Sequence, residues 1–116
     1  MTLAPLPVTS AARHVESVRD LLAAHDGASF PDSLSDGDDA EGVALVLLDA
    51  DIAGLAASYI ASGGTLPAEQ WLVLRECAAV ARVVVPNLAG DAWVYFVRLY
   101  ALTQAMLRSA PDAPAG

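Results

Sequence analysis

Hydrophobic residues recur at intervals of three and four along most of this chain, and this spacing places them on one face of an α-helix. The pattern is clear over residues 65–85, where the stripe consists of Val73, Cys77, Val80 and Val84. Thr65 can cap this helix, and Pro67 is tolerated in a first turn. Pro86 should end it, because proline cannot supply the amide hydrogen that an interior turn requires.

The last predicted helix, residues 91–108, is apolar on nearly every side. One stripe contains Trp93, Phe96, Val97, Tyr100 and Leu107, and a second contains Tyr95, Leu99, Leu102 and Met106. Such a helix should be surrounded, either within its own domain or by a partner chain. Because its link to the preceding helix is short, the two should pack antiparallel, and we expect this C-terminal hairpin to form the core.

Two earlier helices complete the pattern. Residues 9–25 carry a narrower stripe, and we expect this helix at the periphery. Residues 40–62 carry the stripe Leu45, Leu48, Ile52, Leu55 and Tyr59, which favours a helix over a buried strand. The chain is therefore predicted to be all-α, with a four-helix bundle-like domain over residues 9–109 and flexible tails at 1–8 and 110–116.

The composition is unusually apolar for a chain of 116 residues, since 55% of them are hydrophobic. A domain of this size cannot bury all of its surface, so the excess suggests a subunit interface or a membrane. Asp49 and Asp51 interrupt the most apolar helix and disfavour the membrane. Without a secretory signal pattern, we expect a cytoplasmic protein. A homodimer is the expected form, with Trp93, Phe96 and Tyr100 as candidate interface residues.

The net charge of −8 is concentrated in residues 1–51, which hold ten of the fourteen acidic residues. A chain with an acidic half and no basic patch is not expected to bind nucleic acid. The acidic residues favour solubility, and a basic protein partner is the alternative that they leave open.

Metal and cofactor binding are not expected. The acidic loop at residues 32–41 resembles an EF-hand only in part, because Leu34 and Val43 occupy positions that must supply oxygen ligands. The two histidines, His14 and His25, lie about three turns or ~16 Å apart on one helix and cannot share a metal. Surface positions are expected for both.

Asp49 and Asp51 stand two residues apart, so they point in different directions. One of them could face the interior and pair with Arg75, Arg82 or Arg98. If Asp51, Tyr59 and Arg98 converged inside the bundle, they could bind a small acidic or polar ligand.

The sequence contains no nucleophile elbow, zinc-protease motif, phosphate loop or dinucleotide fingerprint. Cys77 lies on an apolar stripe and is expected to be a small buried hydrophobic residue. The preferred hypothesis is therefore a helical interaction or accessory protein with no catalytic motif. The alternatives are a ligand-binding or enzymatic bundle at Asp51, Tyr59 and Arg98, and an acidic inhibitor or immunity-type partner of a basic protein.

Overall fold

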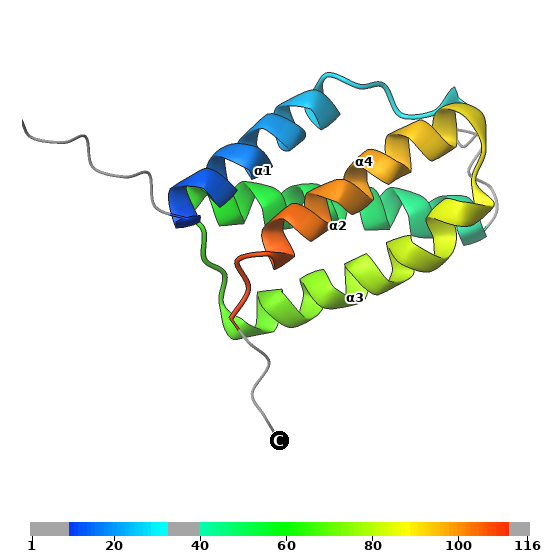
Figure 1. Ribbon diagram of the computed structural model, residues 1–116. Coiled ribbons are helices and arrows are strands. Elements are labelled where there is room, and N and C mark those ends of the chain that lie inside the picture. The colour runs from blue at the N-terminus through cyan, green and yellow to red at the C-terminus, as the bar shows by residue number, and fades with distance from the viewer. Residues whose placement is uncertain (1–9, 33–39, 112–116) are drawn as a thin grey trace, which may run out of the picture.

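The computed structural model describes residues 10–32 and 40–111 (Figure 1). The described residues include four α-helices and the short 3-10 helix η2, and consecutive α-helices run antiparallel (Figure 1). The all-α class and the four-helix arrangement are thus confirmed. The elements are α1 (Ser10–Asp26), α2 (Ala40–Ala61), α3 (Ala68–Val84), η2 (Val85–Asn87) and α4 (Gly90–Leu107).

The core is shared between α2 and α4 rather than confined to the C-terminal hairpin. Each of these two helices contacts all three other α-helices, and α1 and α3 lie on opposite sides of them (Figure 1). Helix α4 buries Phe96, Leu99 and Leu102, while α2 buries Ile52 and Tyr59. The stripe of α2 therefore contributes to the centre of the bundle as fully as the nearly all-apolar α4 does.

Two glycines, Gly63 and Gly64, end α2. Gly63 and Gly64 have φ angles of 76° and 106°, which residues with a side chain rarely adopt. The Gly64 N–H donates to the Tyr59 carbonyl at 2.9 Å, and the Gly63 N–H donates to the Ile60 carbonyl at 3.1 Å. This pair of bonds is a Schellman motif, and it satisfies carbonyls that the end of a helix leaves without partners.

The predicted boundaries of α3 and α4 need small corrections. Pro67, not Thr65, stands at the N-cap of α3, and the Thr65 N–H donates instead to the Ser62 hydroxyl. Pro86 does end α3, through the short helix η2. Helix α4 begins at Gly90, one residue before the predicted start, and Asp91 lies in its first turn.

The predicted tails are only partly described. Residues 1–8 lie outside the described residues, as do 33–39 of the acidic loop and 112–116. Ala110 and Pro111, expected in the C-terminal tail, contact the bundle. Ala110 packs against the core, and the Pro111 carbonyl accepts a hydrogen bond of 3.1 Å from the Arg75 guanidinium.

One segment of the described residues, Ala44–Ala61 in α2, is long and apolar enough to cross a membrane. A helix from the interior of a bundle can meet the same criterion of length and composition. Asp49 lies within this segment and is hydrogen-bonded to α1 and α4. The segment alone therefore does not place the protein in a membrane.

Candidate functional site: a buried His–Asp–Tyr network

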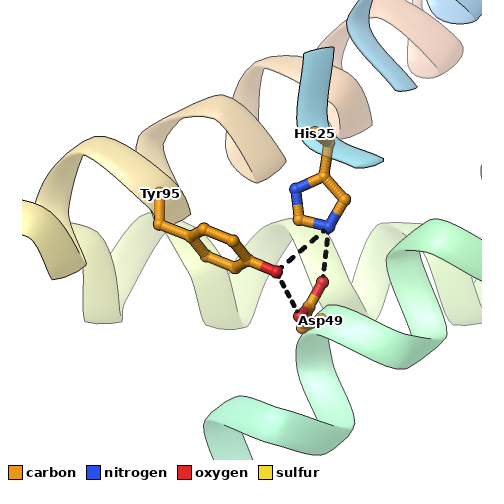
Figure 2. Close-up of polar contacts among 3 residues, drawn as sticks. All are labelled: His25, Asp49 and Tyr95. Atoms are coloured by element: carbon orange, nitrogen blue, oxygen red, sulfur yellow. Dashed lines mark hydrogen bonds and ion pairs between the residues drawn. The ribbon is translucent and has the colours of Figure 1, made fainter. Parts of the chain in front are cut away.

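Three polar side chains from three different helices meet inside the bundle (Figure 2). His25 comes from the last turn of α1, Asp49 from α2 and Tyr95 from the second turn of α4. The His25 Nε2 lies 2.7 Å from Asp49 Oδ1, and the Tyr95 hydroxyl donates to Asp49 Oδ2 at 2.6 Å. The Tyr95 oxygen also lies 3.4 Å from His25 Nε2, which closes the triangle.

The helices and the aromatic rings around this network hold it away from water. The exposed fraction is 6% for the His25 side chain and 18% for that of Asp49. The rings of His25 and Tyr95 have centroids 4.8 Å apart, and Phe30 packs edge-on against Tyr95 at 5.4 Å. Polar groups at such a position require partners, because burial removes the hydrogen bonds that they would make with water.

The chemistry of the three groups fixes Tyr95 as a donor. Burial raises the pKa of the Tyr95 hydroxyl well above its usual range, and its hydrogen bond to Asp49 raises it further. Tyr95 therefore keeps its proton, and each oxygen of the Asp49 carboxylate accepts one hydrogen bond. His25 Nδ1 is also buried, and it has no hydrogen-bond partner among the described residues.

This geometry suits a clamp between helices better than a catalytic centre. Both Asp49 oxygens and His25 Nε2 are already engaged with one another. A general base must present a free lone pair to its substrate, whereas the remaining nitrogen, Nδ1, is enclosed. The network therefore fastens α1 to α2 and α4.

The structure does not bring the predicted ligand-binding residues together. Tyr59 is fully buried, and its hydroxyl lies 2.6 Å from the Ser109 Oγ. Asp51 is exposed and lines a groove between α2 and α3 that includes neither Tyr59 nor Arg98. Arg98 is exposed on α4. The expected polar pocket is therefore not formed, because Tyr59 faces the core while the two charged residues face solvent.

The three predicted interface residues differ in how much of their surface is exposed to solvent. Trp93 is 45% exposed and Tyr100 is half-buried, but only 1% of Phe96 is exposed. Phe96 packs edge-on against Tyr95 and Phe30, with ring centroids 5.2 and 6.2 Å away. It is consequently a core residue and is not available to a partner, which corrects the expectation from the sequence.

The sequence did not predict the His25–Asp49–Tyr95 network, but it did predict that Asp49 and Asp51 point in different directions. Asp49 and Asp51 were expected to differ in direction, and the structure shows Asp49 turned inward and Asp51 exposed. The partner expected for the inward carboxylate was an arginine, and the structure supplies His25 and Tyr95 instead. His25 is buried rather than on the surface, which was the other error.

The expected burial of Cys77 is confirmed. Burial raises the pKa of its thiol, and the negative charges of Asp51 and Glu76 raise it further. This environment is the opposite of the one that activates a cysteine nucleophile. Among the described residues, no group of three histidine, cysteine or acidic side chains is placed to hold a metal ion.

Comparisons of the chain with protein families, with curated proteins and with solved structures find no match.

Proposed function

We propose that this chain is a small helical interaction protein, without a catalytic role, that works as a homodimer or as an accessory subunit. The observation that carries this proposal is the set of large hydrophobic side chains that the described residues leave exposed to solvent. They are Val46, Leu47, Leu72, Val73, Val80, Val83, Trp93 and Val94.

Most of these side chains belong to one end of the bundle. Val46 and Leu47 lie in the first part of α2, Val80 and Val83 in the last part of α3, and Trp93 and Val94 at the start of α4. Because consecutive helices are antiparallel, the start of α2, the end of α3 and the start of α4 meet at the same end (Figure 1). We call these six residues the apolar end.

Exposed apolar area favours association because its removal from water contributes about 25 cal/mol for each Å². Val83 is 69% exposed and Trp93 is 45% exposed, so both retain much area that a partner could cover. A symmetric dimer needs only one surface of each chain, because a two-fold axis pairs that surface with itself. A second copy of this chain is therefore the first partner to test.

The two alternative functions have less support. The enzymatic or ligand-binding bundle required Asp51, Tyr59 and Arg98 in one pocket, and they are apart. The acidic inhibitor was based on the loop at residues 32–41, most of which lies outside the described residues.

Sedimentation equilibrium on the purified chain tests the proposal, with native mass spectrometry to detect any bound partner. We expect a reversible dimer that Val83→Ser weakens by roughly tenfold, in line with the loss of an apolar contact at an interface. Leu72→Ser is the matched control, because Leu72 is 59% exposed on the same helix but lies near its opposite end. A monomer at all concentrations, with no retained protein, would contradict the proposal.

A further inference from the structure

A shallow groove runs between α2 and α3, outside the apolar end. Its volume is about 370 Å³, and it is lined by Ala50, Asp51, Gly54, Leu55, Ser58, Gln70 and Val73. Ala50, Gly54 and Ser58 follow one another at intervals of four residues, so they share a face of α2. The floor of the groove is therefore made largely of very small side chains.

The groove is open to a large occupant. A Cβ atom built on Gly54 would meet no other atom within 4 Å, so no part of the described chain fills this position. Small residues at this spacing allow a second helix to approach closely, because no side chain keeps the two backbones apart. Val73 adds apolar surface on the α3 side, where it is 42% exposed.

The polar groups around the groove attract a positive charge. Asp51 lines the groove, and Glu76 is exposed on α3, next in sequence to Cys77. Glu76 stands three residues after Val73, which lines the groove, so the two residues share a face of α3.

The nearby arginines do not neutralise this region. Arg75 and Arg82 stand seven residues apart on α3 and therefore share a face. Arg75 donates to the Pro111 carbonyl and lines a separate cavity with Trp71 and Leu66. The arginine-bearing face of α3 is thus not the face that lines the groove.

We propose that the α2–α3 groove binds an amphipathic helix from a partner protein, with an apolar face against Gly54 and an arginine or lysine directed at Asp51. Charge complementarity favours this occupant, because a basic side chain can form charge-assisted hydrogen bonds with Asp51. A second copy of this chain fits less well, since its net charge is −8 and it contains no lysine. The inference rests on the proposed role in protein binding, and it names a different surface.

The test uses two fluorescently labelled synthetic helices with the same leucine and alanine face. One carries arginine at its polar positions and the other carries glutamate, and fluorescence anisotropy measures their binding to the full chain. We expect the arginine peptide to bind at least tenfold more tightly than the glutamate peptide. Binding should weaken as salt is raised, because part of the groove is exposed to solvent.

Variants separate binding in the groove from general attraction to an acidic protein. Asp51→Asn should weaken the arginine peptide roughly fivefold, whereas Glu16→Gln, which removes the same charge from α1, should leave it unchanged. Gly54→Leu should fill the groove and abolish binding, and Ala23→Leu on the exposed face of α1 is its control. Equal effects of Asp51→Asn and Glu16→Gln, or equal binding of the two peptides, would overturn the inference.

The outcome can be distinguished from failure of the proposed function. Val83→Ser should weaken the dimer and leave binding of the arginine peptide intact, because Val83 does not line the groove. A dimer that persists while the arginine peptide fails to bind would overturn the groove and leave the proposed function standing. A monomer that binds the arginine peptide in the groove would overturn the homodimer alone.

Discussion

Asp49 and Tyr95 lie 46 residues apart in sequence, yet the Tyr95 hydroxyl donates a hydrogen bond of 2.6 Å to the Asp49 carboxylate. The same carboxylate engages His25, so one acidic residue of α2 holds both α1 and α4. A single carboxylate thus links three helices through hydrogen bonds inside the bundle.

Removal of the shared carboxylate should be costly. Asp49→Ala leaves the buried His25 and Tyr95 without their common partner, and we expect a loss of about 2 kcal/mol in the free energy of unfolding. Asp51→Ala is the matched control, because that side chain is exposed two residues away and should change stability by less than about 0.5 kcal/mol. Urea unfolding followed by circular dichroism measures both. Equal losses in the two variants would show that the network does not stabilise the fold.

The raised pKa of Tyr95 predicts a loss of stability at alkaline pH. A group whose pKa is higher in the folded chain stabilises the fold fully below its ordinary pKa, which is about 10 for tyrosine. Above that pH the unfolded chain ionises first, so this contribution falls as the pH rises. Tyr95→Phe should lose about 1 kcal/mol at neutral pH, and its stability should fall less steeply from pH 9.5 to 11.

Thermal unfolding across this pH range tests the prediction, with Tyr100→Phe as the control at a half-buried tyrosine of the same helix. A decline in Tyr95→Phe as steep as in the unsubstituted chain would contradict the assignment.

Cys77 should resist thiol reagents in the folded protein. It is buried, and the pKa of its thiol is raised by burial and then by Asp51 and Glu76, so little of the reactive thiolate forms. We expect Ellman's reagent at pH 8 to react roughly a hundredfold more slowly than with the urea-unfolded chain. A rate close to that of the unfolded chain would mean that this part of α3 opens readily.

Alanine substitutions at Gly54, within α2, and at Gly63, just after α2, should change the free energy of unfolding in opposite directions. Gly63 has a φ of 76°, so Gly63→Ala should destabilise the protein by about 1 kcal/mol through backbone strain. Gly54 lies within α2, and an added Cβ meets no atom within 4 Å. Gly54→Ala should therefore stabilise it by about 0.5–1 kcal/mol through helix propensity. Chemical denaturation measures both variants, and a gain at Gly63 would show that the Schellman turn is not formed.

The sequence determined the elements of this protein. The three-and-four spacing of apolar residues specified four helices, and Gly63, Gly64 and Pro86 marked where α2 and α3 end. These features are local, since they depend on the periodicity of one helix and on the backbone preferences of single residues. For the same reason, the burial of Cys77 could be predicted from the stripe on which it stands.

Tertiary structure alone decided which polar side chains meet. His25, Asp49 and Tyr95 come from three helices. His25 stands seven residues after the buried Val18, so the spacing already places it on the inward stripe of α1, but nothing within a single helix indicates that Asp49 pairs with a histidine and not an arginine. The ligand-binding residues predicted from the sequence do not meet. Tyr59 faces the core, whereas Asp51 and Arg98 lie on exposed faces of their helices. A contact between helices depends on how each helix is rotated against its neighbours, and that rotation is fixed only when the whole core packs.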